Sequence, residues 1–312
     1  MTTSSENLMK LRDERIFQPV KIAEGFEFCE GPAFARDGSL WLVNVDGGYV
    51  SRVSMNGEIT FVANTGGGPN GGQFDRYGNF IVCECRRRAI VAVSPKGEVS
   101  PLLDSYEGHP LNGPNDIAID ADGSFFFTDP EGSSLDKRIG AVYHCSPGGT
   151  ISRVADGLAY PNGIVINAER TGIYLAETRT QQIHRYIRKS DGSLGPRTLF
   201  CQLEQRSIGG PDGMCLDQLG NLYIAMYGYS CIQVVDAAGN ALHRLATPGA
   251  NPTNCCFGPP HSEFATSLFV TETITNAIWR YEVGIAGMPM HAMVASITGG
   301  APLSNAETRH SL

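Results

Sequence analysis

The sequence predicts an all-β fold, a six-bladed β-propeller. First, six stretches of similar sequence follow one another along the chain. Second, a turn that ends in glycine marks five of them, at residues 37–38, 77–78, 122–123, 171–172 and 219–220, so that successive turns lie 40 to 49 residues apart. Third, every stretch contains several short strand-like segments. Repeats of this length, built from short strands, are typical of propeller blades, whereas a generic β-sandwich would not repeat its turn chemistry.

Each repeat contains segments whose residues alternate between apolar and polar or are apolar throughout. Turns rich in glycine separate them, as in β-hairpins. The expected strands lie at residues 39–45, 49–55 and 58–63; 79–84, 90–95 and 98–103; 124–130, 141–147 and 150–155; 172–178, 182–188 and 197–202; 221–228, 232–237 and 241–247; and 267–273, 277–283 and 291–297. A further strand ahead of each turn is expected to run along the central channel as the innermost strand of its blade.

Closing the circle requires one more outer strand for the sixth blade. Residues 16–28 precede the first full repeat and are expected to supply this strand. The chain therefore divides into an N-terminal arm at residues 1–15, a single propeller domain at 16–298 and a C-terminal tail at 299–312, which lacks apolar periodicity. No helix longer than a few turns is expected.

The composition is that of a soluble globular protein. The 312 residues are 42% hydrophobic and 18% charged, with a formal net charge of −8. Nucleic acids and anionic membranes bind clustered positive charge, so neither is expected as a partner. The first residues are charged where a secretion signal needs an apolar stretch, and the nine cysteines follow no framework spacing. These features predict reduced thiols and a cytoplasmic location.

One acid or amide residue precedes each repeat's turn by about eight residues. These six ring residues are Glu30, Asn70, Asn115, Asn162, Asp212 and Asn254. Because they begin the innermost strands, they are expected to meet at one mouth of the channel. Buried carboxylates and amides need partners, and Ca²⁺ accepts six to eight oxygen ligands of both kinds. The absence of histidine and cysteine from the ring argues against zinc as the preferred ion. The alternative is that each residue only bonds its local backbone, as Asn and Asp often do.

The motifs around the ring residues resemble those of a known family. They are EGP at 30–32, PND at 114–116 followed by FTDP at 127–130, YPNGI at 160–164 and GGPDGM at 209–214. From residue 20 to about 285, the chain resembles the senescence marker protein, gluconolactonase and luciferin-regenerating enzyme family. The resemblance implies a six-bladed propeller with one catalytic divalent metal ion. The oxygen ligands favour Ca²⁺, with Mg²⁺, Mn²⁺, Fe²⁺ or Zn²⁺ as alternatives. The resemblance also implies metal ligands at Glu30, Asn162 and Asp212 and a fourth ligand or substrate contact at Asn115. Asn70 and Asn254 match no ligand of the family and are expected to bind water or substrate.

The activity implied by the resemblance is hydrolysis of a lactone. Family enzymes that act on sugar acids usually carry an arginine just before the PND-like motif, but residues 108–116 read GHPLNGPND here. A sugar-acid lactone is therefore not the expected substrate. His109 and Asn112, on the same loop, are expected to contact the substrate. The oligomeric state is left open.

The expected chemistry is the addition of water to the ester carbonyl. The cation would polarise that carbonyl and stabilise the oxyanion. Asp212 would take the proton of the water, unless a hydroxide on the metal plays that part. Asn115 and Asn162 would donate amide hydrogens to the developing negative charge. Two alternatives remain: a phosphotriesterase-like hydrolase of the same fold, and a non-catalytic propeller that binds a metal ion or a peptide.

Three acids end equivalent strands of their repeats, at Asp129, Glu177 and Glu272. A structural role at the blade corner is expected for Glu177 and Glu272. Asp129 is expected to form the following turn or to support a metal ligand.

Overall fold

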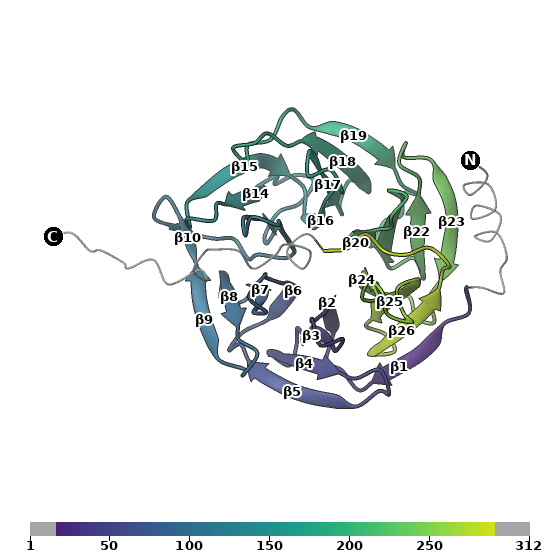
Figure 1. The fold of residues 1–312 in the computed structure, drawn as a ribbon. Helices are drawn as coiled ribbons and strands as arrows, with labels where there is room; N and C mark the ends of the chain where they lie inside the picture. The colour runs from purple at the N-terminus through teal and green to yellow at the C-terminus, as the bar shows by residue number, and fades with distance from the viewer. Residues whose placement is uncertain (1–16, 291–312) are drawn as a thin grey trace.

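The computed structural model describes residues 17–290, and these form a six-bladed β-propeller (Figure 1). Six sheets of four antiparallel strands surround a central channel, and a two-stranded hairpin lies at the edge of the ring. The named elements are all strands, and no helix in the described part of the chain is long and apolar enough to span a bilayer. The predicted fold is therefore confirmed.

The first three blades follow the chain from the channel outward. Blade 1 consists of β2 (Cys29–Phe34), β3 (Leu40–Asn44), β4 (Tyr49–Val53) and β5 (Ile59–Asn64). Blade 2 consists of β6 (Pro69–Phe74), β7 (Phe80–Glu84), β8 (Ala89–Val93) and β9 (Val99–Leu103). The hairpin of β10 (Ser105–Tyr106) and β11 (His109–Pro110) precedes blade 3, which consists of β12 (Ile117–Ile119), β13 (Phe125–Asp129), β14 (Gly140–Cys145) and β15 (Ile151–Leu158).

The remaining blades repeat this arrangement. Blade 4 consists of β16 (Pro161–Ile166), β17 (Gly172–Glu177), β18 (Gln182–Ile187) and β19 (Thr198–Gln202). Blade 5 consists of β20 (Gly210–Leu216), β21 (Leu222–Tyr227), β22 (Cys231–Val235) and β23 (Ala241–Ala246). Blade 6 consists of β24 (Pro252–Phe257), β25 (Ser267–Glu272), β26 (Ala277–Glu282) and, outermost, β1 (Val20–Glu24).

The sixth blade joins the two ends of the described chain. β1 pairs antiparallel with β26, placing Val20 opposite Arg280 and Glu24 opposite Ala277. Residues 16–28 thus supply the outer strand as predicted, and pairing of the first strand with the last closes the ring. The strand expected at 291–297 lies outside the described residues, as do the arm at 1–15 and the tail at 299–312. The division of the chain into those parts stays a prediction.

Six clusters of buried apolar side chains hold the ring together, one between each pair of neighbouring blades. The rings of Trp41 and Phe74 join blades 1 and 2 at 5.3 Å, and those of Phe34 and Phe269 join blades 1 and 6 at 4.9 Å. Because the second strand of each blade lies between two such clusters, it reads as an apolar run rather than an alternating one.

In the fourth repeat the turn lies earlier in the chain than predicted. In most repeats the predicted glycine adopts a left-handed φ, such as 82° at Gly38 and 89° at Gly123. In the fourth repeat Gly172 already belongs to β17, and Arg170 takes the left-handed position with φ of 59°. The guanidinium of Arg170 is held by hydrogen bonds to the buried carboxylate of Asp120 in blade 3. This ion pair fixes a conformation that a non-glycine residue adopts at some cost.

Close approach of the innermost strands requires glycine after four of the ring residues. A Cβ on Gly163 would lie 2.2 Å from the carbonyl oxygen of Asp212, and one on Gly213 would lie 2.0 Å from Cγ of Asn254. Gly31 and Gly71 are crowded by the next innermost strand in the same way. The innermost strands therefore lie so close to one another at the channel that any larger residue at these positions would push them apart.

We expect Gly163→Ala to destabilise the protein by about 1–3 kcal/mol, because its methyl group must displace the backbone of blade 5. Gly148→Ala is the matched control, since the nearest atom to its Cβ is the Ser146 hydroxyl oxygen at 3.9 Å. Urea unfolding of both variants measures the difference. Equal stability of the two variants would show that the innermost strands have room to spread.

Candidate functional site

The structure places the ring residues at the beginning of the innermost strands. Five of them lie within β2, β6, β16, β20 and β24, and Asn115 lies two residues before β12. In those five blades the pairing between the innermost and second strands shifts register at or beside the ring residue, between Glu30 and Ala33, Pro69 and Gly72, Pro161 and Ile164, Pro211 and Met214, and Pro252 and Asn254. Such irregularities re-aim side chains out of the normal alternation of a strand. They explain how consecutive repeats present polar groups at the same depth of the channel.

Four ring side chains from four blades converge. The amide of Asn254 donates to a carboxylate oxygen of Glu30 at 3.3 Å, and the amide of Asn162 donates to the carboxylate of Asp212. The charge of Asp212 in turn helps to raise the pKa of Glu30. Asn115 is also buried, and its backbone carbonyl oxygen accepts the N–H of Gly71 at 2.6 Å.

Asp116 is a third carboxylate at this site, which sequence reasoning missed. Its side chain is buried and accepts the N–H of Ile117 at 2.9 Å and, from the neighbouring blade, the N–H of Ile164 at 3.2 Å. Its position follows a ring residue directly, where four other repeats have glycine. The pattern of one polar residue per repeat is satisfied by Asn115, so it does not point to Asp116, the acid of the PND motif. Its departure from the glycine pattern was the signal that could have revealed it.

Burial raises the pKa values of all three carboxyl groups, and repulsion from neighbouring acids adds to this for Glu30 and Asp212. Burial, followed by the charges of Asp212 and Asp116, raises the pKa of Glu30 well above its usual value. Burial raises the pKa of Asp116 to about 7, against the two backbone hydrogen bonds that lower it. Although Asp212 keeps some accessible surface, protein surrounds its carboxylate closely, and burial and the charge of Asp116 raise its pKa well above the usual value.

The donor set suits a hard divalent cation. Three acids that resist ionisation in one channel would be stabilised by a positive charge between them, and the asparagines beside them offer neutral oxygens. Within residues 17–290, no three His, Cys, Asp or Glu side chains converge as a metal-binding cluster. A cation here would therefore depend on asparagine oxygens as well as carboxylates, which favours calcium-like ions over zinc.

A second set of polar residues holds the loops that lead into the innermost strands. They are Asn44, Glu84, Asp129, Glu177 and Glu272, at the ends of the second strands, and each accepts a backbone N–H from the loop of its own blade. The structural role predicted for Glu177 and Glu272 is confirmed. The carboxylate of Asp129 accepts the N–H groups of Asn112 and Gly113, just ahead of Asn115, and so positions that ring residue.

His109 and Asn112, which were predicted to contact the substrate, lie in other environments in the structure. His109 is exposed in the β10–β11 hairpin at the edge of the ring, paired with Tyr106 (Figure 1). The amide of Asn112 donates to the carbonyl oxygens of Asp129 at 3.4 Å and Ile139 at 3.3 Å, so its donors already serve the loop. Substrate contacts at His109, Asn112 and Asn70 stay predictions.

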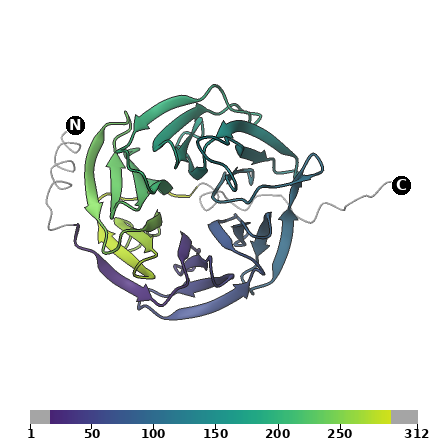
Figure 2. The same cartoon turned by 180° about the vertical axis from the view of Figure 1, so that it is seen from behind.

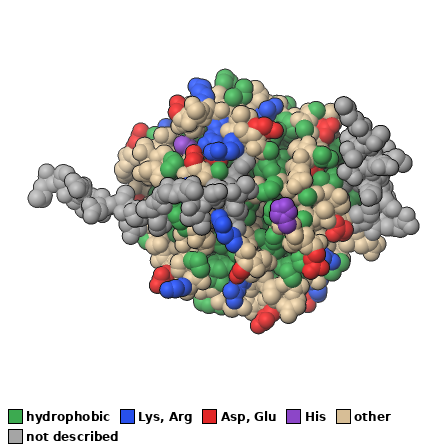
Figure 3. Space-filling model, viewed as in Figure 1, with side chains coloured by type: hydrophobic (Ala, Val, Ile, Leu, Met, Phe, Trp, Pro, Cys, Tyr) green, Lys and Arg blue, Asp and Glu red, His purple; other side chains and the backbone are tan. Residues whose placement is uncertain are grey.

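The opposite end of the channel contains a cavity of about 650 Å³. Its walls are mainly apolar side chains of the innermost strands, and Asp116 and Asn254 lie at its inner end. The segment after β26 crosses this face, where the N–H of Met288 donates to the carbonyl oxygen of Leu216. Figure 3 shows hydrophobic surface near the middle of this face, and Figure 2 shows the opposite face, which holds the loops leading into the innermost strands.

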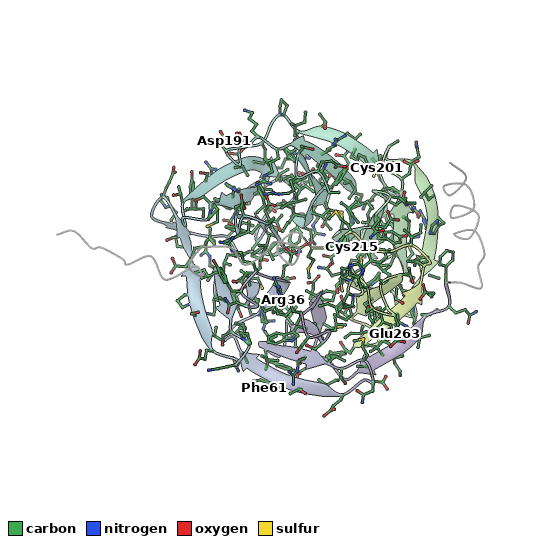
Figure 4. The ribbon with its side chains drawn as sticks, viewed as in Figure 1. Arg36, Phe61, Asp191, Cys201, Cys215 and Glu263 are labelled. Carbon is green, nitrogen blue, oxygen red and sulfur yellow. The ribbon has the colours of Figure 1, made fainter. Side chains whose placement is uncertain are left out.

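Three of the nine cysteines, all of which are free, line this cavity. Figure 4 places Cys215 near the channel, and its sulfur lies 3.5 Å from that of Cys255 in the next blade. Burial raises the pKa of Cys215 and of Cys256 well above the usual thiol value. These thiols therefore behave as small apolar wall residues.

Comparison with known proteins identifies the family. Residues 28–274 match the SMP-30/Gluconolactonase/LRE-like region, so the chain belongs to that family. It is 28% identical to a diisopropyl-fluorophosphatase of Loligo vulgaris over 84% of this chain and 91% of the relative. It is also 28% identical to a gluconolactonase of Zymomonas mobilis, over 80% of this chain and 77% of the relative. Among solved structures, a gluconolactonase of Xanthomonas campestris matches with a TM-score of 0.74 and 26% identity, over 86% of this chain and 89% of the other.

The raised carboxyl pKa values predict an unusual pH dependence of stability. A carboxyl group whose folded pKa exceeds its unfolded pKa contributes stability at low pH and loses that contribution as the pH rises through the folded value. For Asp116 this window runs from about 4 to about 7. In chelator-treated protein, Asp116→Asn should therefore gain stability relative to wild type between pH 5 and pH 8, on the order of 1–4 kcal/mol.

Chemical unfolding at both pH values measures this gain, with and without Ca²⁺. Excess Ca²⁺ should reduce it, since a cation removes the penalty of ionisation. Asp156→Asn controls for the loss of one exposed charge, because the Asp156 side chain is 68% exposed. A stability difference between Asp116→Asn and wild type that stays constant with pH would contradict the assignment of Asp116 to a charge-repelling cluster.

Proposed function

We propose that this protein is a metal-dependent hydrolase that opens a lactone ring at the channel mouth formed by the ring residues. Membership of the family and relatives named gluconolactonase support the hydrolysis of a lactone or related ester. The observation that most supports metal dependence is the burial of Glu30, Asp116 and Asp212 in one channel, where the charges of Asp212 and Asp116 raise the pKa of Glu30 and the charge of Asp116 raises the pKa of Asp212.

Glu30, Asn162 and Asp212 would hold the cation, with Asn115 as a fourth ligand. Their carboxylate and amide oxygens are the ligands that Ca²⁺ prefers. A bound divalent cation would supply a Lewis acid toward the ester carbonyl. The hydrogen bonds that Asn254 donates to Glu30 and Asn162 donates to Asp212 keep the carboxylates oriented whether or not they are ionised.

Two kinds of side chain would act on the substrate. Asp212 keeps accessible surface in the channel and would accept a proton from the attacking water. The amide groups of Asn115 and Asn162 would donate hydrogen bonds to the oxygen on which negative charge develops. Asn70 and Asn254 complete the ring and would bind water or the substrate.

A phosphotriester or phosphofluoridate is the second candidate substrate class. The relative named diisopropyl-fluorophosphatase, which matches over most of both chains, specifically favours it. The same donors would serve an attack on phosphorus, because a phosphoryl oxygen also gains negative charge as the nucleophile adds. Fluoride release from a phosphofluoridate, compared with acid release from lactones, distinguishes the two.

Lactone hydrolysis should depend on a divalent cation. We expect turnover of γ- and δ-lactones, followed with a pH indicator, to be lost after chelation and restored by Ca²⁺. Turnover that survives complete metal removal would refute the metal dependence. Inactivity toward every lactone and phosphofluoridate, with one equivalent of metal bound by elemental analysis, would instead favour a non-catalytic metal-binding propeller.

Asp212→Asn should lower kcat by about 10²–10⁴-fold, the range typical for loss of a general base. The variant should remain folded, because the amide preserves the shape of the side chain and removes a buried charge. Circular dichroism and thermal melting check the fold, and Asp156→Asn is the control for an exposed aspartate. Wild-type kcat in Asp212→Asn would rule out Asp212 as the base.

A further inference from the structure

Two aromatic residues adopt an unfavourable backbone conformation next to the ring. Phe28 and Tyr160 lie two residues before Glu30 and Asn162, with left-handed φ angles of 59° and 63°. At the equivalent positions, the other repeats have glycine three times and proline once, at Gly68, Gly113, Gly210 and Pro252. The left-handed region is costly for bulky side chains and persists where the surroundings impose it, often at functional sites.

Tyr227 is a third aromatic residue at this end of the channel, because it ends β21 and pairs with Gly210, two residues before Asp212. The ring of Phe28 stacks on that of Tyr227 from blade 5, with centroids 6.5 Å apart. Burial and the charge of Glu131, followed by that of Asp212, raise the pKa of Tyr160 to about 12, and Asp212 also contributes to the raised pKa of Tyr227. All three side chains are half-buried. Phe28, Tyr160 and Tyr227, from blades 1, 4 and 5, thus lie at the mouth of the site, and we refer to these three residues as the aromatic wall.

Exposed apolar residues extend this wall outward. Four large apolar side chains on loops of the same face are exposed: Leu135 by 53%, Ile139 by 41%, Ile208 by 74% and Ile274 by 62%.

Each of these loops is tied to the aromatic wall. The Ser133 hydroxyl accepts the N–H of Tyr160 at 2.9 Å, which anchors the loop of Leu135 and Ile139. Thr273, next to Ile274, hydrogen-bonds the Tyr227 hydroxyl. The backbone carbonyl of Ile208 lies beside Gly228, the residue after Tyr227.

Three cationic groups on this face already have partners. Arg86 pairs with Asp46 at 2.8 Å, Arg138 pairs with Glu177 at 3.4 Å, and Arg179 lies over the ring of Tyr160 at 5.3 Å. A substrate covered with hydroxyl groups would lose its hydrogen bonds to water against such a wall, whereas an apolar substituent would be favourably removed from water.

We propose that the substrate is a lactone whose ring bears an apolar substituent, aromatic or alkyl, which lies against Phe28, Tyr160 and Tyr227. This inference rests on the proposed lactonase function and specifies its substrate class. The ring residues would act on the ester while the aromatic wall selects the substituent.

A series of δ-lactones with the same six-membered ring tests this selection. With Ca²⁺ present, kcat/KM should rise from δ-valerolactone to δ-decalactone by roughly fourfold for each methylene that is buried, and by at least tenfold in total. The polyhydroxylated glucono-δ-lactone should fall below δ-decalactone by at least the same factor. If none of the lactones is hydrolysed, the proposed function fails. If they are hydrolysed but glucono-δ-lactone is preferred, or the alkyl chain has no effect, only this inference is overturned.

Variants of the wall test which residues contact the substituent. Phe28→Gly and Tyr160→Gly should fold, because glycine adopts these φ angles without strain, and melting temperature checks this. Each should lower the ratio of kcat/KM for δ-decalactone over δ-valerolactone at least fivefold, whereas Tyr160→Phe should retain the ratio.

Phe61→Ala provides the control, since Phe61 is 61% exposed on the outer strand β5 (Figure 4). Its ratio should equal that of wild type. An unchanged ratio in both glycine variants would overturn the assignment of the aromatic wall. The preference of the wild-type protein among the δ-lactones tests the inference without any variant.

Discussion

The repulsion between carboxylates buried in one channel is the constraint on which the rest of the structure depends. Glu30, Asp116 and Asp212 come from blades 1, 3 and 5, so their charges act on one another only when the ring is closed. Each charge is costly to bury alone and costlier beside the others. The apolar clusters between the blades and the pairing of β1 with β26 supply the opposing stabilisation. The site is therefore a property of the closed ring rather than of any single motif.

Local devices repeat around the ring and keep the carboxylates in place. Corner residues such as Asp129 and Glu177 accept N–H groups from the loops ahead of the ring residues, so those loops are fixed before the channel begins. Glycines after four of the ring residues let the backbone of one innermost strand lie against the backbone or side chains of the next. Both devices hold the backbone around the ring residues. Rigidity of this kind is what preorganised electrostatics requires.

Much of the fold followed from the sequence because the propeller repeats itself. The period, the strand pattern and the need to close the circle were all visible as recurring residues, and so was one polar position per blade. Asp116 was hidden because it departs from the repeat at the position next to a ring residue. The surroundings of Asn112 were hidden because a loop sequence does not reveal that its amide already bonds Asp129 and Ile139. Likewise, a backbone angle such as that of Tyr160 has no sequence signature when an aromatic residue occupies a position where most other repeats have glycine.

Acids and amides alternate around the channel once Asp116 is included. Blades 1, 3 and 5 contribute the acids Glu30, Asp116 and Asp212, with the ring residue Asn115 directly before Asp116, whereas blades 2, 4 and 6 contribute Asn70, Asn162 and Asn254. This order places a blade that contributes only an amide between each pair of blades that contribute an acid. Two of the amides donate to a neighbouring acid, Asn254 to Glu30 and Asn162 to Asp212. The side-chain oxygen of Asn254 also accepts the N–H of Cys255 at 2.8 Å, and an amide oxygen has a second lone pair to offer. The alternation therefore lowers the repulsion while keeping oxygen donors around the channel, which is the arrangement that a single axial cation would need.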